Sequence, residues 1–141
     1  MSPTISADGG YVNVADLRKQ YTKAGLLESG LPEKPMSLFK QWFREALDSE
    51  VVEPNAMTLA TVSPEGVPNA RIVLMKGIEQ DGITFFTNYE SRKALELKKT
   101  PYAACTFWWA ELERQVRISG PVEKVPEKAS VEYFDSRPRE S

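Results

Sequence analysis

The sequence after Pro54 consists of short apolar runs separated by turn residues. Asp81-Gly82 lies between two of these runs and is a strong β-hairpin signal, and the SPEG segment at 63–66 is typical of a turn. Strands this short, joined by tight turns, pair in an antiparallel sheet, and about five of them predict a small barrel. The runs predicted to be strands are residues 57–62, 69–77, 83–87, 102–109 and 114–125.

Helical periodicity occurs before these strands and between them. Aromatic and apolar residues recur at helical spacing from about Pro35 to Ser49, and their aromatic stripe is predicted to pack in the core. A second helix is predicted over about residues 91–98. Shorter helices are predicted over about residues 14–23 and from about residue 126 toward residue 137.

The chain is predicted to have two parts. Residues 1–13 are polar, contain glycine and are predicted to form a disordered arm. The N-terminal arm with its short basic helix therefore comprises residues 1–34. Residues 35–141 are predicted to form one folded domain, and a chain of this length can build a real core.

Composition excludes several kinds of chemistry. The chain has no histidine, so Ser-His-Asp and Cys-His catalysis and imidazole-based zinc sites are excluded within it, and no metal site is expected. Cys105 lies in an apolar run and is predicted to be a buried small hydrophobe rather than a nucleophile. We therefore expect a bound cofactor to supply any reactive group.

The charge balance limits the kinds of partner that the chain is expected to bind. The net charge is −2 and the pI is near 5.3, which argues against nucleic-acid or membrane-surface binding. No apolar run is long enough to cross a bilayer and no signal-peptide pattern begins the sequence, so cytoplasmic localisation is expected. An anion site in such a chain must be a local concentration of Arg and Lys.

Arg92 and Lys93 fall in the first turn of the predicted helix at 91–98. A helix N-terminus carries a partial positive charge and unpaired N–H groups, so cations there are unfavourable unless an anion lies between them. Strand, turn, N–H groups and two cations together fit a phosphate site. The alternative is a solvated pair on a surface helix, and this segment alone does not separate the two.

Three further segments carry polar side chains in suggestive patterns. Strand alternation places Gln115, Arg117 and Ser119 on one face, which alone fits a solvated face better than a ligand pocket. Arg71 and Lys76 lie on opposite faces of their strand, about 16 Å apart at about 3.3 Å per residue, and could hold two parts of an extended ligand or could be solvated strand ends.

Tyr133 and Arg137 are four residues apart and share one face of the last predicted helix. A phenol and a guanidinium together suit a second phosphate. The alternative is a tyrosine packed under the arginine stem.

In this order, the segments RIVLMK, FFTNYESRK, RQVRISGPVEK and YF-x-SRPR resemble the pyridoxamine 5′-phosphate oxidase family, over nearly the whole chain from LRKQY (17–21) to Ser141. The resemblance implies a mainly β fold with flanking helices, an antiparallel, Greek-key-like split β-barrel that binds FMN. It also implies homodimers with FMN at the interface. The implied reaction oxidises pyridoxine 5′-phosphate or pyridoxamine 5′-phosphate to pyridoxal 5′-phosphate, with oxygen as acceptor and hydrogen peroxide as product.

The resemblance also assigns residues by matching position. No side chain is assigned a catalytic role, because the flavin carries the redox step. The residues expected to hold FMN are Arg71, Ile72, Val73, Leu74, Phe86, Thr87, Arg92, Lys93 and Gln115. The residues expected to hold the substrate are Arg18, Lys19, Gln20, Tyr21, Lys76, Tyr133, Arg137 and Ser141.

One departure from the family is evident. Family members continue past the SRPR-x-S motif into a segment with further strands and flavin contacts, so the barrel is predicted to be C-terminally incomplete. The chain is then either a fragment of a longer protein, which is the favoured interpretation, or a natural short form. Two alternatives follow. The first is a non-catalytic flavin- or pyridoxal-phosphate-binding module, and the second is a split-barrel flavin reductase, for which Tyr133 and Arg137 together would have no purpose.

Overall fold

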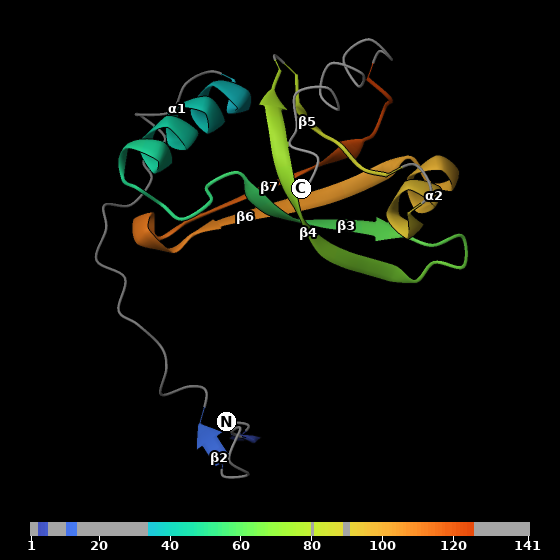
Figure 1. Cartoon of the computed structure of the whole chain (residues 1–141), viewed down its shortest axis with the longest axis horizontal. Helices are drawn as coiled ribbons and strands as arrows, with labels where there is room; N and C mark the ends of the chain where they lie inside the picture. The colour runs from blue at the N-terminus through green and yellow to red at the C-terminus, as the bar shows by residue number, and fades with distance from the viewer. Residues whose placement is uncertain (1–2, 6–10, 14–33, 80, 89–90, 126–141) are drawn as a thin grey trace.

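The computed structural model describes residues 3–5, 11–13, 34–79, 81–88 and 91–125, and the account below concerns those residues. Figure 1 shows two α-helices and the strands of one main sheet, with three of these strands following one another without a helix between them. The elements are β1 (Pro3–Ile5), β2 (Tyr11–Asn13), α1 (Pro35–Asp48), β3 (Ala56–Val62), β4 (Pro68–Ile78), β5 (Ile83–Phe85), α2 (Arg92–Lys99), β6 (Tyr102–Trp109), the short 3-10 helix η3 (Ala110–Leu112) and β7 (Arg114–Pro121).

The main sheet has five strands in the order β5-β4-β3-β6-β7, with every neighbouring pair antiparallel. Strands β3, β4 and β5 follow one another directly, and β6 returns after α2 to lie on the other side of β3, which is Greek-key connectivity. The sheet curls into a half-barrel with α1 and α2 near its two ends (Figure 1). The predicted fold class is therefore confirmed.

Predicted and observed structure differ by more than one residue at three places. The strand predicted over 83–87 ends at Phe85, because the chain turns there toward the start of α2. The strand predicted over 114–125 ends at Pro121, and proline has no N–H to continue a ladder. The disordered arm predicted over 1–13 is wrong at β1 and β2, which pair antiparallel and contain β-branched and aromatic residues that favour strands. The helices predicted over 14–23 and from 126 lie outside the described residues.

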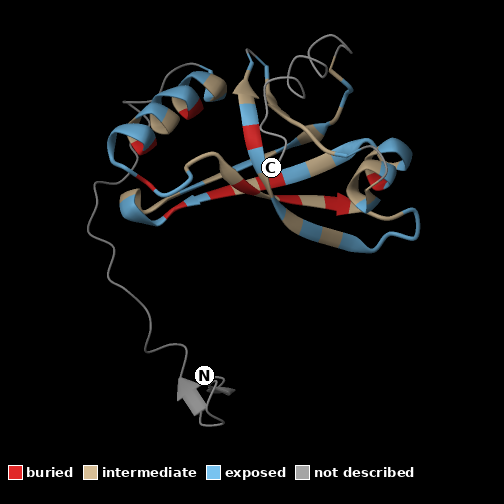
Figure 2. Ribbon diagram, in the orientation of Figure 1, coloured by how far each residue is buried: buried red, intermediate tan, exposed pale blue. Residues whose placement is uncertain are grey.

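The core lies between α1 and the inner face of the sheet. Phe39 of α1 packs against Phe107 of β6 with ring centroids 5.2 Å apart. Trp109 stacks on the ring of Phe39, with centroids 6.2 Å apart. The indole N–H of Trp109 donates to the carbonyl of Pro54 at 2.9 Å, so its one polar atom is satisfied. Figure 2 shows the buried residues in red, on α1 and along the strands of the main sheet. The predicted packing of the aromatic stripe in the core is confirmed.

Side chains alternate between two faces of the sheet. Along β7, Gln115, Arg117 and Ser119 are exposed, while Val116 and Ile118 pack against the core, as predicted. Cys105 is buried on the inner face, and burial raises the pKa of its thiol to about 11, so it is neutral at ordinary pH.

Within the described part of the chain, no helix is long and apolar enough to cross a membrane.

Candidate functional site

The first turn of α2 is built as the sequence predicts. Ser91 caps the helix, and its Oγ accepts a hydrogen bond from the Ala94 N–H at 3.2 Å. The hydroxyls of Thr87 and Ser91 lie 3.3 Å apart, which fixes the segment after β5 against this turn. Arg92 and Lys93 occupy the turn, and it contains no acidic residue. Two cations therefore stand at the positive end of the helix dipole.

Arg71 projects from β4 across its neighbour β3 on the inner side of the sheet. Its Nη1 donates to the Leu59 carbonyl at 3.2 Å and to the Thr61 hydroxyl at 2.7 Å, and its side chain is 24% exposed. Its Nη2 lies 3.7 Å from Glu96 Oε1 of α2. Neither Nη2 nor Nε donates a hydrogen bond to any residue that the structure describes. One edge of the guanidinium fork is thus available to an acceptor.

Glu96 is the centre of this polar cluster. Its carboxylate is buried and accepts hydrogen bonds from the Thr61 hydroxyl at 2.5 Å and from Asn69 Nδ2 at 2.6 Å. The Thr61 hydrogen bond lowers the pKa of Glu96 against the opposing effect of burial, and the Asn69 amide and the charges of Arg71 and Arg92 lower it further. Arg71 of β4 thus contacts α2 through Glu96, one helical turn after Arg92.

The sequence pointed to Arg71 and Arg92 but not to the other members of this cluster, which are Glu96, Thr61 and Asn69. Glu96 lies four residues after Arg92, which places both on one face of α2 and was a usable signal. Thr61 and Asn69 face each other across β3 and β4 in the observed register, but neither residue type marks a site by itself.

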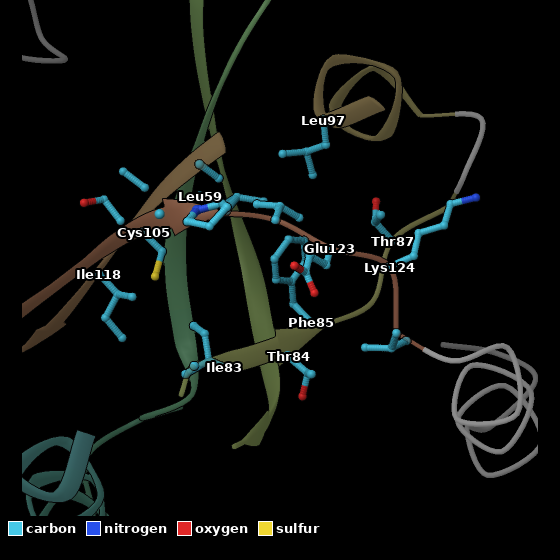
Figure 3. Close-up of a pocket in the computed structure, with 18 of the residues that line it drawn as sticks. Leu59, Ile83, Thr84, Phe85, Thr87, Leu97, Cys105, Ile118, Glu123 and Lys124 are labelled. Atoms are coloured by element: carbon cyan, nitrogen blue, oxygen red, sulfur yellow. The ribbon is translucent and has the colours of Figure 1, made fainter. Parts of the chain in front are cut away.

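A pocket of about 510 Å³ lies beside α2, between β5 and the ends of β6 and β7. Figure 3 shows Leu97 reaching into it from α2, opposite side chains of the sheet that include Leu59 and Cys105. Phe86 and Thr87, both predicted to contact a cofactor, line this pocket. Its wall is mainly apolar and includes Ala94 and Leu95, which follow Arg92 and Lys93 in the first turn of α2. The two cations do not themselves line it, so it suits a largely apolar ligand whose anionic end extends to that turn.

The other predicted site residues are not gathered around Arg71. Val73 packs against the core, while Ile72, Leu74 and Gln115 are exposed on the outer face of the sheet. Lys76 is also exposed. The predicted substrate residues Arg18, Lys19, Gln20, Tyr21, Tyr133, Arg137 and Ser141 lie outside the described residues.

Comparison with known proteins identifies the family. Residues 43–141 match the family model described as Pyridoxamine 5′-phosphate oxidase. The chain belongs to the pyridoxamine 5′-phosphate oxidase family. It is 59% identical over 128 residues to a pyridoxine/pyridoxamine 5′-phosphate oxidase of Nostoc punctiforme, a match that covers 91% of this chain and 60% of that protein. A relative of the same name from Cupriavidus necator is 56% identical over 125 residues, covering 89% of this chain and 59% of that protein.

A solved structure supports the fold assignment. PhzG from Burkholderia lata, determined in complex with tetrahydrophenazine-1-carboxylic acid, superposes with a TM-score of 0.78 at 30% identity, over 82% of this chain and 58% of that one. The chain thus spans about 60% of the length of the curated family members that it matches. The predicted family resemblance is confirmed.

Proposed function

We propose that this chain binds FMN and takes part in oxidising pyridoxine 5′-phosphate or pyridoxamine 5′-phosphate to pyridoxal 5′-phosphate, with oxygen as acceptor and hydrogen peroxide as product. The observation that carries the proposal is the contact of Arg71 with Glu96 of α2, the helix whose first turn holds Arg92 and Lys93. Relatives at 59% and 56% identity carry the name of this oxidase, which supports the reaction class.

The charges of the cluster fit a phosphate monoester. Three cations, Arg71, Arg92 and Lys93, stand against one carboxylate, Glu96, so the cluster is net positive in a chain whose overall charge is −2. The free edge of the Arg71 fork and the N–H groups of the first turn of α2 supply donors for phosphate oxygens. Arg71, Arg92 and Lys93 would therefore hold the FMN phosphate.

The remaining FMN assignments follow from position. Phe86 and Thr87 line the pocket next to this helix turn and would contact the flavin. FMN, when bound, supplies the hydride-accepting group, and the side chains around it supply placement and charge. Ile72, Val73 and Leu74 would contribute through strand backbone, as the family resemblance implies.

We also propose that the chain forms a homodimer through the outer face of the sheet. Ile72, Leu74 and Trp108 are 64%, 38% and 52% exposed, and the register joins them through β3 and β6 on one face. Exposed apolar groups gathered on one face are typical of interaction surfaces. Gln115 faces Trp108 in the β6–β7 register, on the opposite side of the sheet from Arg71. A Gln115 contact to FMN would therefore come from the second copy.

Trp108→Ser should weaken this self-association by about 30-fold, because a central interface tryptophan contributes about 2 kcal/mol or more. Sedimentation equilibrium measures the dimer constant directly. Val52→Ser, which removes an 84% exposed apolar side chain outside the sheet, is the matched control and should leave association unchanged. A wild-type chain that stays monomeric, or a Trp108→Ser variant that associates normally, contradicts the proposed interface.

Incubating the chain with FMN and pyridoxine 5′-phosphate in air tests the oxidase proposal, and pyridoxal 5′-phosphate is the expected product. Absence of product from a flavin-loaded, dimeric preparation argues against turnover by this chain. The second candidate function is then a flavin-binding module without turnover. The chain spans about 60% of its curated relatives, which is the observation that favours this candidate. Lys76 and the substrate residues outside the described ranges, together with cytoplasmic localisation, stay predictions.

A further inference from the structure

We propose that Glu96 is a positioning residue for the FMN phosphate, holding Arg71 and the first turn of α2 in the arrangement that grips it. The inference rests on the proposed function, since it assumes that Arg71, Arg92 and Lys93 hold FMN. Glu96 itself would not touch the phosphate. It acts through the side chains that do.

The hydrogen-bond chain determines which edge of Arg71 faces a ligand. Nη1 is occupied by the Leu59 carbonyl and the Thr61 hydroxyl, and that hydroxyl donates in turn to Glu96 Oε1. Glu96 also attracts the guanidinium directly, with Nη2 at 3.7 Å. The fork is thus held in one orientation, with Nε and the rest of Nη2 left as donors. A fork fixed in advance loses little conformational freedom when it binds phosphate.

The same carboxylate fixes α2 to the sheet. Among the eight described residues of α2, Glu96 alone is buried. A helix of this length has little stability by itself, so its position depends on tertiary contacts. An apolar side chain would ordinarily make such a contact. A carboxylate bound by Thr61 of β3 and Asn69 of β4 instead gives directional contacts, which set where Arg92 and Lys93 stand relative to Arg71.

Glu96→Gln tests this role because it keeps the size of the side chain and removes half of its acceptors. The amide NH₂ replaces one of the two carboxylate oxygens, so either Thr61 and Arg71 or the Asn69 amide loses its acceptor, and the negative charge that attracts Arg71 is removed in both cases. We expect FMN affinity, measured by quenching of flavin fluorescence, to fall about tenfold. Riboflavin, which lacks the phosphate, should bind the variant as it binds the wild type, and inorganic phosphate should compete about tenfold less well.

Two further variants separate positioning from folding. Thr61→Val removes the hydroxyl that links Arg71 to Glu96 and keeps the side-chain volume, and it should reproduce the selective loss of FMN affinity. Thr61→Ser restores the hydroxyl and should restore the affinity. Glu65→Gln makes the same charge change at an exposed carboxylate in the β3–β4 turn and should bind FMN like the wild type.

The results of these titrations distinguish failure of the proposed function from failure of the positioning role of Glu96. A wild-type chain that does not bind FMN removes the proposed function and this inference with it. A wild-type chain that binds FMN, with Glu96→Gln and Thr61→Val binding it equally well, overturns the positioning role alone. Equal losses for FMN and riboflavin also overturn it, because they would show that Glu96 supports the fold rather than the phosphate site.

Discussion

Replacing Arg92 and Lys93 together by alanine should weaken FMN binding by on the order of 100-fold or more, because each charge-assisted phosphate contact contributes about 1.5–3 kcal/mol. The substitution removes both cations from the first turn of α2, which contains no acidic residue. A fluorescence titration of FMN measures the loss. The backbone N–H groups and Arg71 remain, so residual weak binding is expected.

The matched control removes two cations that the structure places elsewhere. Lys40 of α1 and Lys99 at the end of α2 are both exposed, and Lys40→Ala with Lys99→Ala should leave FMN affinity unchanged. The stability of the Arg92–Lys93 variant should stay within about 0.5 kcal/mol of the wild type, since relief of repulsion by the helix dipole offsets the lost attraction between Arg92 and Glu96. If both double variants lose affinity equally, the effect is one of overall charge and the phosphate assignment is wrong.

Phe107→Ala should lower the free energy of unfolding by about 3–5 kcal/mol, the usual cost of truncating a buried phenylalanine. Phe107 is fully buried and contacts the rings of Phe39 and Trp109 with centroids 5.2 and 5.8 Å away. Its loss leaves a cavity where α1 meets the sheet. Urea unfolding followed by tryptophan fluorescence measures the change.

Leu47→Ala provides the comparison for this core substitution. Leu47 lies on α1 but is 55% exposed, so its truncation should change stability by no more than about 0.5 kcal/mol. A Phe107→Ala protein that unfolds at the same urea concentration as Leu47→Ala would show that α1 does not pack on β6 as described.

The fold was predictable because its signals are local. The apolar run at residues 102–109, the alternation along residues 114–121 and the turns at 63–66 and 81–82 predict short strands joined in an antiparallel sheet. The N-terminus of α2 was predictable for the same reason, since Ser91 and the residues after it determine the cap. The strand ends were less clear, because the end of β5 is set by where α2 must begin.

The cluster behind the phosphate site could not be predicted in the same way. Glu96 is 35 residues from Thr61 and 27 from Asn69, and each of these residues alone resembles an ordinary surface or strand residue. Only the register of β3 against β4, and the placement of α2 over them, brings them together. The placement of Gln115 across the sheet from Arg71 likewise depends on the register and on which face is buried.

Titration of the wild-type chain with FMN and with riboflavin tests the central claim most directly. The two ligands share the ring system and the ribityl chain and differ in the phosphate. If Arg71 and the first turn of α2 form a phosphate site, FMN should bind more tightly than riboflavin by on the order of 100-fold. Equal affinities, or no binding of FMN, would contradict the account.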